Sequence, residues 1–166
     1  LEQSGLAYQI SKRRAEEELL AEVSRGLDAV IVNPSWVFGR HGMEYRGGEM
    51  IAKVRQSPLV PYLMGGFCAA HIEDVVDGIV SALERGETGQ RYILGGENVS
   101  FRAALERSAR AMGLRRRFVL APRWAVGLAA VVLEPWDRLR GRRRRITRET
   151  WRYLSCFQYF DSSKAR

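Results

Sequence analysis

The sequence predicts an α/β fold in which helices cover a parallel β-sheet. Residues 7–25 repeat apolar or small side chains at about the 3.6-residue period of an α-helix, and Gly26 is a suitable helix stop. The run DAVIVNP at 28–34 follows it and is apolar on both faces, which is typical of a parallel strand buried under helices. Helix, glycine and buried strand together make half of a βαβ alternation.

The remaining elements are predicted in order along the chain. Residues 35–49 are rich in glycine and predict a loop at the C-terminal end of the first strand, where open α/β sheets bind ligands. Ser100 is a suitable N-cap, and Gly113 a suitable stop, for one of the later helices. As far as residue 96, the further elements are a short helix at 50–56, turn and strand at 58–71, a helix at 73–85, and a strand with its turn at 90–96. After them we expect a helix at 100–112, a strand within 115–122, a helix at 122–139 interrupted at Pro135, and a short helix at 146–154.

The composition fits a globular protein of the cytoplasm. The chain has 166 residues, with 46% hydrophobic and 28% charged, which is enough for one domain with a real core. Its two cysteines, Cys68 and Cys156, are far apart and lack metal-ligand spacing, which argues against a disulfide framework. No signal peptide is visible, although the chain does not begin with Met. We therefore expect a reducing, cytoplasmic environment and no metal site.

Positive charge supports a different hypothesis, that of a basic, non-catalytic module complete as it stands. The net charge is +8, and the excess is concentrated in RLRGRRRR at 138–145. Such a tract could bind nucleic acid or an acidic membrane. However, it lacks interleaved aromatic residues or a recognised DNA-binding motif, and the apolar run at 124–133 is too short to span a bilayer. We favour a solvated basic loop over nucleic-acid or membrane binding.

Tyr8 and Lys12 form a candidate catalytic pair. Residues four apart share a helix face, so the two side chains are expected side by side. An ammonium group beside a phenol favours the tyrosinate form, and such a tyrosine can exchange a proton with a carbonyl or an alcohol. The alternative for this spacing is an ordinary exposed pair. His71 and Asp74 form a second pair, which we interpret as the start of a packing helix because no nucleophile accompanies it.

Several motifs in order resemble the extended short-chain dehydrogenase/reductase family. They are YQISKRRAEEELLAEVSRGLDAVIVNPSWVFG at 8–39, GGFCAAHIEDVVDGIVSALERGETGQRYILGGENVSF at 65–101 and YFDSSKAR at 159–166. The first contains Tyr-x-x-Ser-Lys, and the second a His-x-x-Asp-Val helix followed by a Gly-x-x-Tyr-x-Leu-Gly-Gly strand. The similarity spans nearly the whole chain and is weakest over 102–150. Its nearest subgroup is the dihydroflavonol-reductase-like and NAD-dependent epimerase/dehydratase proteins.

This resemblance implies the fold in more detail. The chain would be the C-terminal half of a Rossmann-like doubly wound parallel sheet, plus a small and mostly helical substrate domain. Residues 1–57 would be the C-terminal part of the dinucleotide-binding domain with its catalytic helix, and 58–166 a mixed substrate-binding region. The family's Gly-x-x-Gly-x-x-Gly loop does not follow a strand here, since Gly39 and Gly42 come after the catalytic helix. We therefore expect a portion of a longer enzyme that is inactive alone.

The resemblance also implies roles for single residues. Tyr8 would be the general acid/base, and Lys12 would promote its ionisation and bind the nicotinamide ribose of NAD or NADP. Pro34, Ser35, Trp36 and Val37 would pack against the nicotinamide and bind its carboxamide through backbone groups. The family's third catalytic residue, a Ser or Thr ahead of the tyrosine, has no counterpart. Gly39-Arg40 stands where the family often has Gly-Pro.

The implied reaction is hydride transfer at a carbonyl or alcohol carbon of a small molecule. A reductase and a nucleotide-sugar epimerase or dehydratase use the same tyrosine, so the sequence leaves both open. NAD and NADP are also left open. A homodimer through the catalytic helix is a further arrangement that the resemblance allows.

Overall fold

The first helix and strand form as the sequence predicts. The computed structural model describes residues 7–40, 46–122 and 155–166, so the helices predicted at 122–139 and 146–154 and the arginine tract lie outside the described residues. Helix α1 covers Ala7–Ser24 and strand β1 covers Ile31–Pro34. Gly26 has a φ of 106°, a backbone conformation that glycine adopts without strain, and it ends the helix as expected.

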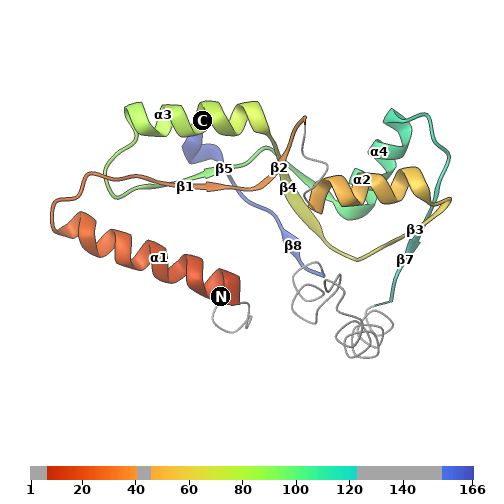
Figure 1. Cartoon of the computed structure of the whole chain (residues 1–166), viewed down its shortest axis with the longest axis horizontal. Helices are drawn as coiled ribbons and strands as arrows, with labels where there is room; N and C mark the ends of the chain where they lie inside the picture. Colours follow the sequence, from red (N-terminus) through yellow and green to blue (C-terminus); the bar gives the residue numbers. More distant parts are fainter. Residues whose placement is uncertain (1–6, 41–45, 123–154) are drawn as a thin grey trace, which may run out of the picture.

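A parallel pair of strands lies between two helices. Strand β1 pairs in parallel with β5 (Arg91–Leu94), and helix α3 (Ile72–Arg85) lies on the opposite side of this pair from α1 (Figure 1). Val32 of β1 packs with a buried cluster of Ala70, Val75 and Leu94 on the α3 side. Because side chains alternate along a strand, the next residue, Asn33, faces α1. The predicted parallel sheet is therefore confirmed.

A second sheet carries an aromatic cluster. Strand β4 (Gly66–His71) pairs in parallel with β2 (Trp36–Phe38) and antiparallel with β6 (Glu97–Ser100). Strand β8 (Phe157–Gln158) pairs in parallel with the start of β4, at Gly66 and Phe67, whereas β2 pairs with its end. Phe67 of β4 lies at the centre of the cluster, with ring centroids 4.6 Å from Trp36, 5.6 Å from Phe38 and 5.2 Å from Phe101.

Two helices and a third strand pair build the other end of the molecule. Strand β3 (Leu59–Tyr62) pairs in parallel with β7 (Arg117–Leu120), and helices α2 (Arg46–Gln56) and α4 (Phe101–Ala111) lie beside them (Figure 1). The core here consists of Val54, Val60, Leu105 and Ala109. A short 3₁₀ helix, η3 (Ser163–Ala165), follows β8.

Some elements differ from the prediction. The segment 35–49 is not one loop, because β2 and the first turn of α2 fall within it. Strands β6 and β8 and helix η3 were not predicted, whereas β3 and β7 lie within the predicted strand segments at 58–71 and 115–122. Strands β6 and β8 are four and two residues long and pair with β4, which is distant from them in sequence, so they leave little local signal.

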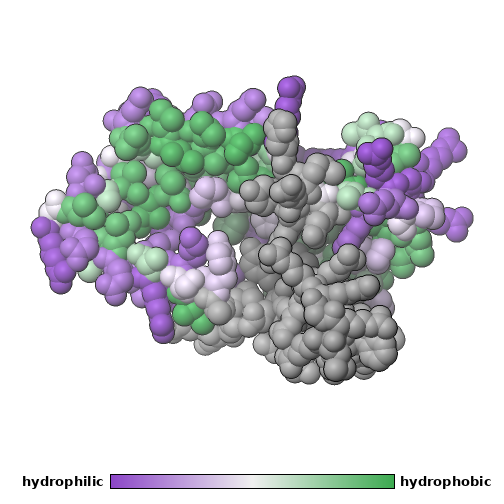
Figure 2. Space-filling view, viewed as in Figure 1, coloured by the Kyte–Doolittle hydropathy of each residue, from purple (hydrophilic) through white to green (hydrophobic). Residues whose placement is uncertain are grey.

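One helix leaves an apolar face uncovered. Exposed side chains on α3 include Val76, Ile79, Val80 and Leu83, of which Leu83 is 82% exposed. Figure 2 shows hydrophobic colour gathered where Figure 1 places α3. On the described part of the chain, β1 pairs only with β5, so its other edge is open. No helix among the described residues is both long and apolar enough to cross a membrane.

Candidate active site

Tyr8 and Lys12 lie side by side at the start of α1, as their spacing predicts. The Lys12 Nζ is 5.8 Å from the centre of the Tyr8 ring. Tyr8 is 71% exposed and belongs to no core cluster of the described residues. Its backbone carbonyl accepts a hydrogen bond from Ser11 Oγ at 2.8 Å, within the helix. The phenolic hydroxyl is therefore open to a ligand.

Helix α1 runs in the opposite direction to β1. The chain reverses between Ser24 and Ile31, and Glu16 in the middle of α1 contacts Asn33 near the end of β1 (Figure 1). The N-terminal turns of α1, with Tyr8 and Lys12, consequently lie toward the C-terminal end of β1. This is the end of a parallel strand at which open α/β sheets bind ligands.

The residues predicted to contact the nicotinamide lie at that strand end. Pro34 is the last residue of β1 and is exposed, and Ser35 connects β1 to β2 with its N–H donating to the Leu94 carbonyl at 3.1 Å. The Trp36 ring stacks on Phe67, and its indole N–H donates to Gln158 Oε1 at 3.3 Å. The Trp36 ring thus belongs to the aromatic cluster, whereas Val37 on the other side of β2 is exposed.

Two buried polar atoms flank Pro34 without a hydrogen-bond partner among the described residues. They are Asn33 Oδ1 and Ser35 Oγ. Buried polar atoms are nearly always paired in folded proteins, so these two indicate a missing ligand or water. A carboxamide offers both an N–H donor and a carbonyl acceptor, which complement an amide oxygen and a hydroxyl group. The residues present therefore fit the nicotinamide end of a dinucleotide.

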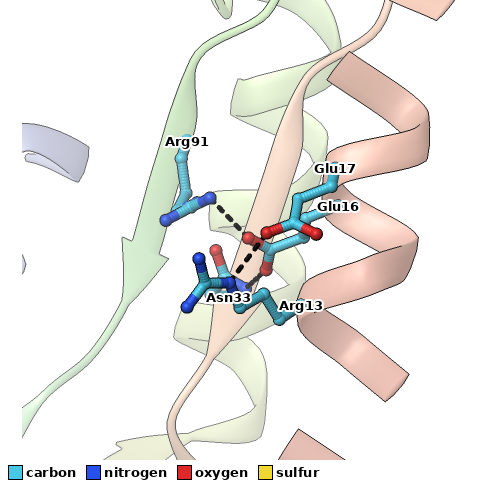
Figure 3. Close-up of polar contacts among 5 residues, drawn as sticks. All are labelled: Arg13, Glu16, Glu17, Asn33 and Arg91. Carbon is cyan, nitrogen blue, oxygen red and sulfur yellow. Dashed lines mark hydrogen bonds and ion pairs between the residues drawn. The ribbon is translucent and has the colours of Figure 1, made fainter. Parts of the chain in front are cut away.

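A polar network ties α1 to the two parallel strands. Asn33 Nδ2 donates to Glu16 Oε1 at 2.9 Å, and the Arg91 guanidinium of β5 lies 2.5 Å from Glu16 Oε2 (Figure 3). Arg13 and Glu17 form a separate ion pair on the same helix at 2.8 Å. Sequence reasoning missed both Glu16 and Asn33. The sequence feature that could have indicated Glu16 is its spacing, because it lies four residues after Lys12, as Lys12 lies four residues after Tyr8.

His71 and Asp74 have the structural role that the sequence suggested. His71 is the N-cap of α3, and its Nδ1 accepts from the Glu73 backbone N–H at 3.4 Å. Asp74 lies in the first turn of the same helix, where a negative charge is stabilised by the helix dipole. His41 lies outside the described residues.

Comparisons with known proteins show which proteins the chain resembles. A Synechocystis sp. protein named dihydroflavonol 4-reductase is 32% identical over 96% of this chain. The crystal structure of gox2253 is 34% identical, covers 95% of the chain and superimposes with a TM-score of 0.73. No family model matches. Nearly the whole chain is therefore similar to part of proteins of the short-chain dehydrogenase/reductase family.

The similarity covers only part of these longer relatives. The chain spans about half the length of the curated relatives it matches, 48% of the Synechocystis protein. A dTDP-glucose 4,6-dehydratase from Bacillus anthracis, solved in complex with NAD, shares the fold with a TM-score of 0.61 at 16% identity, over 90% of this chain and 51% of the dehydratase. The mixed α/β architecture with parallel strands is thus that of the Rossmann-like epimerase/dehydratase fold.

Proposed function

We propose that this chain supplies the catalytic pair and the nicotinamide end of the cofactor site in an NAD(P)-dependent oxidoreductase. The observation that carries the proposal is the placement of Tyr8 and Lys12. They share one face of α1, and that helix is tied to a strand whose end has two unpartnered buried polar atoms. A ligand at this strand end would meet the phenol, the ammonium group and both of these atoms.

Tyr8 would act as the general acid/base. The cofactor supplies or accepts the hydride at the reacting carbon. When a carbonyl is reduced, the Tyr8 hydroxyl gives its proton to the carbonyl oxygen, so that hydride and proton together yield an alcohol. In the reverse direction, the tyrosinate takes the hydroxyl proton. The Lys12 ammonium stabilises the tyrosinate in both directions.

Four groups would hold the nicotinamide portion. Lys12 would donate to a ribose hydroxyl, and the exposed ring of Pro34 would contact the nicotinamide face. Asn33 Oδ1 and Ser35 Oγ would pair with the carboxamide, while Trp36 and Val37 would fix the backbone of this segment through β2. In this proposal Trp36 positions the segment from the core instead of contacting the cofactor with its ring.

A nucleotide-sugar epimerase or dehydratase is the second candidate. It is favoured by the fold shared with the dTDP-glucose dehydratase, and a reductase by the Synechocystis relative. Both reactions need the same tyrosine and lysine, and they differ in whether the hydride returns to the substrate within one turnover. We include a homodimer through α1 in the proposal, because most side chains of α1 are exposed on the described chain.

The test uses the protein that carries this chain, expressed at its natural length. Consumption of NADH and NADPH is followed with a panel of aldehydes and ketones, and nucleotide sugars are analysed for epimerised or dehydrated products. Tyr8→Phe removes only the phenolic oxygen, so turnover should fall by about 10²- to 10⁴-fold, the usual contribution of a general acid. Because Tyr8 is exposed, the melting temperature should not change. Turnover near the wild-type level would overturn the catalytic role of Tyr8.

A further inference from the structure

We propose that Glu16 is a positioning residue, which fixes α1 and the Asn33 amide so that Tyr8, Lys12 and Asn33 face one ligand. This inference rests on the proposed function of the tyrosine and lysine pair. It assigns a role to a carboxylate that touches neither Tyr8 nor Lys12. This role depends on where its two oxygens bind, on the geometry of the helix, and on how little apolar packing holds that helix.

The Glu16 carboxylate connects α1 to two neighbouring strands at once. Its Oε1 accepts from Asn33 on β1, and its Oε2 pairs with Arg91 on β5 (Figure 3). These strands are hydrogen-bonded in register, with Asn33 opposite Ile93 and Ile31 opposite Arg91. A carboxylate held at two points on a rigid parallel pair has little freedom to rotate. The Glu16 side chain is 22% exposed and that of Arg91 51%, so only the carboxylate of this pair is better shielded from solvent than in the pair of Glu17 with Arg13, where the side chains are 57% and 49% exposed.

The helix transmits this restraint to the catalytic pair. Positions 8, 12 and 16 follow one another at intervals of four residues, so each is rotated by about 40° and displaced by about 6 Å from the next. Tyr8 therefore lies within about 80° of Glu16 around the axis. Anchoring Glu16 limits both rotation of α1 about its axis and sliding along β1, which are the movements that would turn Tyr8 away from the strand end.

Apolar packing provides little alternative restraint. Among the described residues, no side chain of α1 belongs to the buried hydrophobic core, whereas α3 and α4 both contribute to it. The apolar side chains Ile10, Leu19 and Val23 of α1 are only half-buried. The contacts of Glu16 with Asn33 and Arg91 consequently have a large share in placing the helix.

Glu16 also determines how Asn33 presents its amide. A carboxylate can only accept hydrogen bonds, so Asn33 must turn its NH₂ group toward Glu16. The amide oxygen then points elsewhere, and it is one of the two buried side-chain atoms that have no hydrogen-bond partner among the described residues. If Glu16 were absent, the amide could rotate and would no longer offer a fixed acceptor to a carboxamide N–H. Loss of Glu16 should therefore have two separable effects: it should misplace Tyr8 and Lys12, and it should weaken binding of the dinucleotide.

Two substitutions at Glu16 and one control separate these effects. Glu16→Ala removes both contacts, whereas Glu16→Gln keeps a carbonyl oxygen for Asn33 and replaces the oxygen that pairs with Arg91 by an NH₂ group, which abolishes that ion pair. Glu17→Ala is the matched control, because it breaks the ion pair with Arg13 on the same helix without touching either strand. The wild type and the three variants are compared at natural length. The quantities measured are kcat, the KM of the dinucleotide and the melting temperature.

We expect Glu16→Ala to lower kcat by about tenfold to a hundredfold, the cost of a misplaced catalytic group, and to raise the dinucleotide KM. Glu16→Gln should leave that KM near the wild-type value, and Glu17→Ala should change neither constant. A general loss of stability would not give this split between the two Glu16 variants. If Glu16→Ala behaved like Glu17→Ala, or if Glu16→Gln raised KM as much as Glu16→Ala, the inference would be overturned.

Amide hydrogen exchange distinguishes a failure of this inference from a failure of the proposed function. If the wild-type protein showed no turnover, the proposed function would fail, and the placement of α1 would still be measurable. Glu16→Ala should then speed exchange within Ala7–Ser24 relative to wild type, and Glu17→Ala should not. Equal exchange in the two variants would overturn the role of Glu16, whatever the protein catalyses.

Discussion

Phe67 connects the candidate site to the stability of the fold, and its replacement gives a sharp test. The side chain is 1% exposed and lies under the Trp36 ring, in the strand that pairs with β2. Truncating a buried Phe to Ala costs about 3–5 kcal/mol. The aromatic contacts with Trp36, Phe38 and Phe101 account for about 0.5–1.5 kcal/mol each within that loss. Since domains are stable by about 5–15 kcal/mol, Phe67→Ala should remove a substantial part of the free energy of unfolding.

The assay is urea unfolding of the natural-length protein, followed by circular dichroism and by tryptophan fluorescence. Phe67→Leu keeps much of the buried volume and loses mainly the ring contacts, so it should cost less free energy of unfolding than Phe67→Ala. Phe157→Ala is the control, because that ring is 57% exposed on β8 and its removal should cost little. A free energy of unfolding for Phe67→Ala within about 1 kcal/mol of wild type would refute the description of this cluster as the core that supports β2.

Three further outcomes are expected. Lys12→Met should lower turnover and raise the dinucleotide KM without changing the melting temperature, and unchanged kinetics would contradict its role. Gly96→Ala would place a Cβ 2.2 Å from the Ala69 carbonyl oxygen, so it should force β6 and β4 apart and lower the melting temperature. An unchanged melting temperature would exclude that clash. A hydrogen bond and the charge of Arg107 hold the pKa of Glu97 below its ordinary value, so this pair stabilises the fold above the ordinary carboxyl pKa and less as pH falls. Glu97→Gln should therefore destabilise the protein more near pH 7 than near about pH 3, and an equal effect at both pH values would argue against the ion pair.

The elements that sequence analysis predicted well have complete local signals. Helix α4 has its N-cap at Ser100, whose Oγ accepts from the Ala103 N–H at 3.1 Å, and a stop at Gly113 with a φ of 65°. Helix α1 and strand β1 have the right periodicity and a glycine between them. By contrast, the three residues of β2 lie in a glycine-rich segment and become a strand only through pairing with β4. No residue close to β2 in the sequence indicates that it pairs with β4.

The same distinction applies to the candidate site. Tyr8 and Lys12 were predicted to share a face because helix geometry fixes residues four apart. Glu16 has the same spacing, but its role depends on Asn33, 17 residues later, and on Arg91, which the β1–β5 pairing brings beside it. Spacing alone does not reveal such contacts, since it does not specify which strand faces the helix.

The open edge of β1 and the apolar face of α3 have a practical consequence for handling this chain by itself. An unpaired strand edge can form hydrogen bonds with another molecule, and exposed aliphatic side chains add a non-directional attraction. We therefore expect the isolated chain to aggregate, with losses that grow with concentration, temperature and storage time. Leu83, which is 82% exposed at one end of α3 and distant in sequence from Tyr8, Lys12 and Glu16, is the natural position for a solubilising charge.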